Sequence, residues 1–180
     1  MRICRNDAIA LMVDIQERLF PHIDQHERLE KNCGILIQGL QTLQIPVIVT
    51  EQYPKGLGNT IGSLSALVKD SPPVEKISFS CCGTDAVMSR LKQSGRKLVI
   101  LFGIEAHVCV LQTCLDLKDL EYQPVIVEDC IGSRKAGDKE TAVRRMVQTG
   151  VVISSYESLL FELCRTAGAP EFKTISALVK

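Results

Sequence analysis

The sequence has no tryptophan, only 4% aromatic residues, only three histidines and no net charge. The charge is zero because 21 basic residues balance 21 acidic ones. Without an excess of Lys and Arg there is no electrostatic footprint for a nucleic acid, so we expect none as a partner. No apolar run approaches the roughly 20 residues that a membrane-spanning helix needs, so we expect no membrane partner.

Signals for export and for zinc are also missing. The apolar run in the opening MRICRNDAIALMVD is too short for a convincing signal peptide, lacks a cleavage site and ends at Asp14. No C-x-x-C occurs, and His22, His26 and His107 make no zinc-binding spacing with the cysteines. We interpret the opening run as a first strand.

The eight cysteines do not indicate a disulfide framework. A chain of 180 residues buries enough surface to form a core without such staples. We therefore expect a reducing, cytoplasmic location. The adjacent Cys81 and Cys82 are interpreted as small residues at a strand–helix junction.

Apolar runs typical of strands alternate with segments of helical periodicity. Strands are predicted at 8–13, 46–50, 74–79, 98–102, 124–128 and 151–153, and helices at 25–43, 63–68, 84–95, from about 108, 138–150 and 155–168. This alternation predicts an α/β fold of three layers, with helices on both faces of a mostly parallel sheet. We expect one domain over residues 1–180, with a core at 6–168 and a tail at 169–180. The Gly- and Pro-rich segment 51–63 is predicted to be a loop, of the length usual for binding loops or lids.

Three ionisable residues stand near the carboxyl ends of predicted strands, where ligands bind in open parallel sheets. Asp14 ends the first strand, Lys76 lies in the third, and Cys109 follows the fourth strand where a helix begins. A helix N-terminus favours a thiolate, and a nearby base can take a thiol proton. Each residue also has a plainer interpretation: Asp14 as a helix cap, Lys76 as a surface charge and Cys109 as a buried core thiol.

Three stretches together make the chain resemble the isochorismatase-like cysteine hydrolases, which include nicotinamidases and N-carbamoylsarcosine amidohydrolase. They are LMVDIQERLF at 11–20, VEKISFS at 74–80 and LFGIEAHVCV at 101–110, in the family's order and spacing. The resemblance covers about residues 6–165. It implies a Rossmann-like six-stranded sheet of order 3-2-1-4-5-6, a homo-oligomer, and a catalytic triad at Asp14, Lys76 and Cys109.

The resemblance also implies how the acyl group would be held. The family has a non-proline cis peptide that would fall between Ile104 and Glu105, placing the backbone N–H groups of Glu105 and Cys109 in an oxyanion hole. We take Gln16, Phe20, Tyr53 and Ile104 as candidate substrate-binding residues. Phe20 is equally a candidate for plain core, and Tyr53 for an anchor of its loop.

Two differences between this sequence and other members of the family narrow the expected chemistry. Nicotinamidases carry an Asp-x-His-x-His metal site after strand two, whereas Glu51, Gln52 and Tyr53 stand here, so we expect no metal and no cofactor. The nucleophilic cysteine, missing in some true isochorismatases, is present. The closest similarity is to the small metal-free isochorismatase-domain proteins.

Two functions follow as hypotheses. The first is hydrolysis of a small amide or related acyl compound through a thioester on Cys109. The second is a non-catalytic binding or scaffolding role on the same fold. Thiol redox sensing through Cys109 and Cys114 is a weaker alternative, because their spacing of five suits direct pairing on one helix poorly.

Overall fold

The computed structural model describes every residue from Met1 to Lys180. Its centre is a six-stranded parallel sheet of order β3-β2-β1-β4-β5-β6. The strands are β1 Ala8–Val13, β2 Val47–Gln52, β3 Val74–Lys76, β4 Leu98–Ile104, β5 Gln123–Gly132 and β6 Val152–Ser154. Both the parallel sheet and its strand order confirm the predicted fold class.

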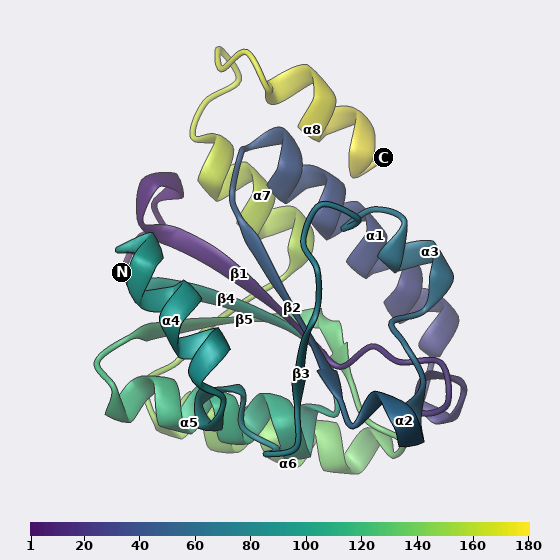
Figure 1. Cartoon of the computed structure of the whole chain (residues 1–180). Helices are drawn as coiled ribbons and strands as arrows, with labels where there is room; N and C mark the ends of the chain where they lie inside the picture. The colour runs from purple at the N-terminus through teal and green to yellow at the C-terminus, as the bar shows by residue number, and fades with distance from the viewer.

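Helices cover both faces of the sheet (Figure 1). They are α1 His26–Thr42, α2 Pro54–Leu57, α3 Gly62–Ser65, α4 Asp85–Ser94, α5 Leu111–Asp119, α6 Ala136–Gln148, α7 Tyr156–Cys164 and α8 Phe172–Leu178. Figure 1 shows α1, α7 and α8 on one side of the sheet and α4, α5 and α6 on the other. None of these helices is both long enough and apolar enough to cross a bilayer.

The central strands are apolar throughout because both of their faces are covered. All six residues of β1 and all seven of β4 are buried. Alternate residues of β1 contribute to two separate hydrophobic clusters, with Met12 in the cluster under α1 and α7 and Leu11 in the cluster under α4 and α5. This is the pattern expected for a parallel sheet between two helical layers.

At Gly103, the end of β4 lies so close to the backbone of β1 that a side chain at this position would not fit. Gly103 has a φ of +122°, and an added Cβ would clash with the backbone oxygen and nitrogen of Val13. Asp14 follows Val13 directly, and its own φ is +51°. Glycine at position 103 therefore brings the turn that carries Cys109 against the strand end that carries Asp14.

The expected C-terminal tail at 169–180 is wrong. This segment forms α8, which contacts α1 and α7 and buries Ile175 in the cluster on that face. Partly buried Phe172 packs against the same cluster and lies 6.3 Å from Phe161, centroid to centroid. The segment is too short to show clear periodicity, and only the exposed ends of α1 and α7 give it a surface to cover.

Two strands, β3 and β5, differ most in length from the prediction. β3 ends at Lys76 instead of residue 79, because the carbonyls of Ser78 and Phe79 turn to accept hydrogen bonds from the Lys76 ammonium. β5 continues to Gly132, through a segment expected to be a loop. A register shift in the pairing of β4 with β5 lets the second half of β5 pair with Gly103 and Ile104, at the end of β4.

The predicted loop 51–63 is more ordered than expected. Its first two residues belong to β2, and α2 forms within it. The backbone of Thr60 pairs with Gln16 in an isolated antiparallel bridge, and the buried Glu51 carboxylate accepts from the N–H and hydroxyl of Thr60 at 2.7 and 2.8 Å. The loop is thus tied to the sheet at both ends.

Candidate functional site

Asp14, Lys76 and Cys109 come from three separate elements and interact in one buried cluster. The Lys76 ammonium lies 2.6 Å from Asp14 Oδ2, and both side chains are almost wholly inaccessible to solvent. Cys109 is 7% exposed, and its pKa responds to the charges of both Asp14 and Lys76. The three residues that the sequence nominated are therefore neighbours.

The carboxylate of Asp14 is also held through its second oxygen, Oδ1. The hydroxyl of Thr50, on β2, donates to Asp14 Oδ1 at 2.7 Å, and the backbone N–H of Asp14 donates to the Thr50 carbonyl at 3.2 Å. Asp14 Oδ2 is buried against the Lys76 ammonium. The carboxylate is therefore fixed in place through both of its oxygens.

The Lys76 ammonium is held by three oxygen atoms besides those of Asp14. They are Gln52 Oε1 at 2.7 Å, the Ser78 carbonyl at 3.1 Å and the Phe79 carbonyl at 3.0 Å. Burial would lower the pKa of Lys76, but the Asp14 carboxylate and nearby thiols outweigh that effect and hold the pKa above its ordinary value.

Cys109 sits in the π-helical turn Ala106–Val110 that joins β4 to α5. Burial raises the pKa of its thiol to about 12; the Asp14 charge adds to the rise, and Lys76 opposes it. The resting group is thus a neutral thiol, not the thiolate that a helix N-terminus led us to expect. Such a thiol becomes nucleophilic only when a base removes its proton.

The peptide bond between Ile104 and Glu105 is cis, at the position that the family resemblance implied. The Glu105 carbonyl accepts from the N–H groups of Val108 and Val110, while the Glu105 N–H donates to no other group. The Glu105 carboxylate accepts from the backbone N–H and Nε of Arg134, with the shortest contact at 3.0 Å. These bonds fix the peptide that the sequence nominated for an oxyanion hole.

The four candidate substrate-binding residues do not share one role. Gln16 is fully buried, and its side-chain amide bonds the backbone of Gln52 and Gly58, so it joins β1 to β2 and the following loop. Phe20 and Ile104 are core residues of the cluster under α1. Their burial gives all three a structural role, and the binding role expected of them stays a prediction.

Tyr53 is the exception among those four. It is 52% exposed and lines a hollow of about 420 Å³ beside β3, together with Lys76 and Ile77. Of the candidate catalytic residues, Lys76 lines this hollow, whereas Asp14 and Cys109 do not.

Sequence reasoning missed four residues around the cluster. Thr50 and Gln52 position Asp14 and Lys76, as described above. Thr113 donates to the Cys109 carbonyl at 2.6 Å and accepts from the N–H of Cys81 at 2.9 Å. Cys81 is buried 3.8 Å from the Thr50 hydroxyl, and burial raises its pKa to about 11. The position of Thr50 and Gln52 at the carboxyl end of β2 was the signal that could have found two of them.

The region where nicotinamidases bind metal is built differently here. Glu51 bonds Thr60, and Gln52 bonds Lys76 and the Ile77 carbonyl. No three His, Cys, Asp or Glu side chains are grouped for a metal ion. These residues do not fit a metal, so no reaction step is derived through one.

Comparison with known proteins agrees with this architecture. The isochorismatase domain model matches residues 8–158. The secreted isochorismatase effector Isc1 of Phytophthora sojae is 36% identical over 185 residues, covering 99% of this chain and 87% of the relative.

Two solved structures extend the comparison. The structure described as MAR1 ribonuclease from Caenorhabditis elegans has a TM-score of 0.94 at 34% identity, covering 99% of this chain and 92% of that one. The Escherichia coli YcaC gene product, described as an octameric hydrolase of unknown specificity, has a TM-score of 0.92 at 22% identity, covering 99% and 90%. The second likeness shows the fold alone. From its matched domain and its relatives, the chain belongs to the isochorismatase family and has the fold of its hydrolases.

Proposed function

We propose that this isochorismatase-family protein is a cysteine hydrolase that cleaves a small amide or related acyl compound, with Cys109 as nucleophile. The observation that carries the proposal is the buried Asp14–Lys76 ion pair beside Cys109, whose thiol is too weakly acidic to ionise by itself. A carboxylate fixed beside such a thiol is suited to act as its general base.

The reaction divides into two steps. Asp14 takes the thiol proton as Cys109 Sγ attacks the carbonyl carbon, and the N–H groups of Glu105 and Cys109 stabilise the oxyanion. The proton then passes from Asp14 to the departing nitrogen, leaving a thioester. Water attacks the thioester with Asp14 again as base, which releases the acid and restores the thiol. Lys76 orients Asp14 and balances its charge throughout.

The test is a screen for ammonia or amine release from small amides and carbamoyl compounds, with the Cys109→Ala protein as control. Trapping of a covalent adduct on Cys109, located by peptide mass mapping, supports the thioester route. Turnover that survives in Cys109→Ala would overturn it.

A binding or scaffolding role without turnover is the alternative on the same fold. It predicts that Cys109→Ala leaves the cellular effect of the protein unchanged.

One similar structure is described as a ribonuclease, so the substrate screen includes single- and double-stranded RNA. The zero net charge of this chain favours the small molecule over RNA.

We also propose a homo-oligomer in the cytoplasm. Tyr53, Ile77 and Phe79 are exposed around β3, at 52%, 74% and 53%, which is an apolar surface suited to a second copy. The structural neighbour YcaC, described as octameric, supports the oligomer. For the location, eight free cysteines suit a reducing compartment. The Phytophthora relative, in contrast, is named as a secreted protein. Light scattering on wild type and Ile77→Glu tests the oligomer, and fractionation of cells tests the location.

A further inference from the structure

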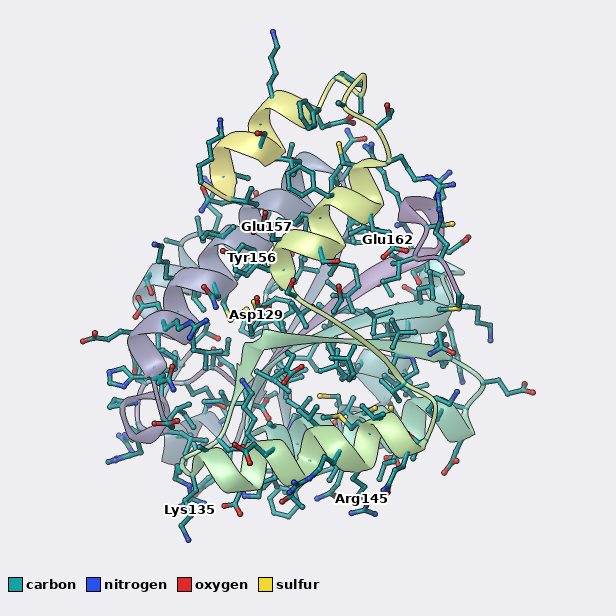
Figure 2. The ribbon with its side chains drawn as sticks, turned by 180° about the vertical axis from the view of Figure 1, so that it is seen from behind. Asp129, Lys135, Arg145, Tyr156, Glu157 and Glu162 are labelled. Atoms are coloured by element: carbon teal, nitrogen blue, oxygen red, sulfur yellow. The ribbon has the colours of Figure 1, made fainter.

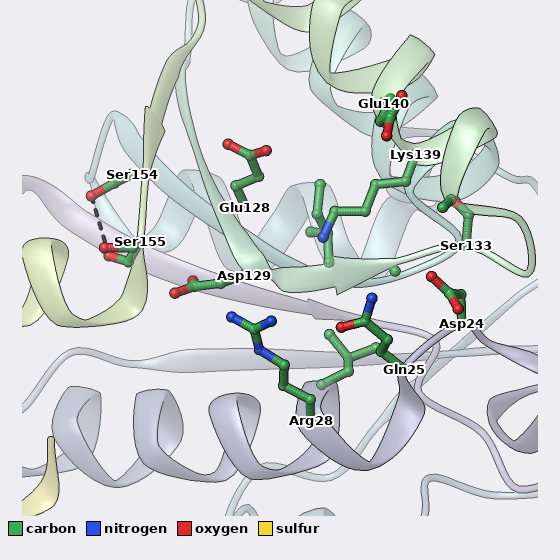
Figure 3. Close-up of a pocket in the computed structure, with 14 residues that line it drawn as sticks. Asp24, Gln25, Arg28, Glu128, Asp129, Ser133, Lys139, Glu140, Ser154 and Ser155 are labelled. Atoms are coloured by element: carbon green, nitrogen blue, oxygen red, sulfur yellow. Dashed lines mark hydrogen bonds between the residues drawn. The ribbon is translucent and has the colours of Figure 1, made fainter. Parts of the chain in front are cut away.

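A second hollow, of about 430 Å³, lies apart from Asp14, Lys76 and Cys109, none of which lines it. It opens at the carboxyl ends of β5 and β6, between the first turns of α1 and α6 (Figure 3). Its volume falls within the roughly 300–1,000 Å³ of small-molecule sites. Its lining is mostly charged or hydroxylic, so it is suited to a polar ligand.

Two cations reach into this hollow without a partner. Arg28 extends from α1 and Lys139 from α6, and Figure 3 shows both side chains directed at the same space. Neither belongs to any ion pair of the chain. Burial lowers the pKa of Lys139 even though Glu128 and Asp129 act in the opposite direction. The ammonium has therefore lost water without gaining a counter-ion in contact.

Four acidic residues line the same hollow and also lack ion pairs: Asp24, Glu128, Asp129 and Glu140, of which Glu128 and Asp129 lie within β5. Asp129 cannot turn freely toward Arg28, because its Oδ1 accepts from the N–H of Tyr156 at 2.9 Å, where α7 begins (Figure 2). Its carbonyl accepts from Asn32 Nδ2 at 2.8 Å, which fixes the backbone as well. Glu128 is exposed and makes no hydrogen bond or ion pair through its carboxylate.

We propose that this hollow binds a small zwitterion of the α-amino-acid type. Its carboxylate would lie between Arg28 and Lys139, and its ammonium against Glu128 and Asp129. An anion alone would meet the acidic residues of the lining, and a cation alone would meet the two basic groups. A ligand that carries both charges satisfies both sets of groups at once. Ser133 and Ser155 also line the hollow, where their hydroxyls bond His107 Nδ1 at 2.9 Å and the N–H of Ser158 at 3.3 Å.

The experiment is saturation-transfer NMR on the full chain, first with pools of the common L-amino acids and then with L-threonine as the charge probe. Two analogues of L-threonine each lack one charge: 3-hydroxybutanoate has no ammonium and 1-amino-2-propanol has no carboxylate. We expect amino-acid binding in the millimolar range or tighter, weakened at least about tenfold by loss of either charge.

Three variants locate the site. Arg28→Gln and Glu128→Gln should each weaken binding about tenfold or more, since each removes one charged contact. Arg145→Gln is the matched control, because Arg145 lies farther along α6, exposed and directed outward (Figure 2). Thermal melting of each variant checks that the chain is folded.

Several results would overturn the proposal. These are no binding by any pool, equal binding of 3-hydroxybutanoate, or binding that survives in Arg28→Gln but disappears in Cys109→Ala. The last result would place the ligand at the candidate catalytic cluster. Because binding is measured without turnover, this test is independent of the proposed hydrolase activity.

Discussion

Lys76 Nζ lies 2.6 Å from Asp14 Oδ2, although β2 separates the strand of Lys76 from the strand that ends at Asp14. Gln52 and Thr50, both on the intervening strand, contact Lys76 and Asp14 respectively. The ion pair is therefore supported from β2 and not by direct pairing of its own strands. Asp14 therefore depends on Lys76 more than Lys76 depends on Asp14, because the ammonium has more hydrogen-bond partners besides the ion pair.

We predict that Asp14→Asn abolishes hydrolysis but makes Cys109 easier to alkylate. The Asp14 charge raises the pKa of Cys109, while Lys76 lowers it, so removing the carboxylate increases the thiolate fraction at neutral pH. Turnover should fall by roughly 10²–10⁴-fold because the base is lost. The measurements are iodoacetamide labelling rate and product release on the same sample. Slower labelling of Cys109 in the variant would contradict the electrostatic account.

Lys76→Met should destabilise the fold more than Asp14→Asn does. Without Lys76, the buried Asp14 keeps only the Thr50 hydroxyl and its own backbone bond, and an unpaired buried charge typically costs about 3–5 kcal/mol. Without Asp14, the ammonium still has its three oxygen acceptors. Urea denaturation of the two single variants and the Asp14→Asn/Lys76→Met double variant measures the difference. Additive single-variant losses would show that the pair is not coupled.

Gly103→Ala should be far more damaging than Gly150→Ala. Both glycines have positive φ, but only at Gly103 does an added Cβ meet backbone, that of Val13. At Gly150 nothing lies within 4 Å of the added atom, so the cost is the conformational one of about 1 kcal/mol. Comparison of melting temperatures checks the prediction. Equal losses would mean that the strand ends are free to move apart.

Ile175→Ala should cost about 2–5 kcal/mol of stability, because Ile175 is fully buried where α8 meets the core cluster. Thr174→Ala, at an exposed position of the same helix, should change stability by less than about 0.5 kcal/mol. Chemical denaturation of both variants measures the two effects. A negligible loss in Ile175→Ala would indicate that α8 does not stabilise the domain.

The free energy of unfolding should fall as pH rises above 9. The folded pKa values of Cys82, Cys109 and Cys114 are raised to about 12, from 9.0 for a free thiol, by burial. The unfolded chain therefore loses thiol protons first, and stability present below pH 9 is lost progressively toward pH 12. Urea midpoints between pH 8 and 10.5 measure the slope. Cys114→Ala should flatten it, and an unchanged slope would show that other groups dominate.

The amino-acid pattern alone predicted the class of fold and placed three ionisable candidates near strand ends, while the family resemblance joined them into one candidate site. The all-apolar runs of β1 and β4 predict strands buried on both faces; Asp14 stands directly after β1, and Cys109 five residues after β4. These features depend on local periodicity, which the side chains themselves carry. The strand order and the cis bond came from family resemblance and not from the residues.

Only the tertiary structure decided the rest, because the deciding contacts join residues far apart in the chain. The amide of Gln16 is bound by the backbone of β2, a contact that its sequence neighbours do not reveal. The helix at 172–178 packs on α1 and α7, which offer it a surface to cover. Cys109 became a neutral thiol because neighbouring segments exclude water from it, and burial of that kind has no signature in a local sequence.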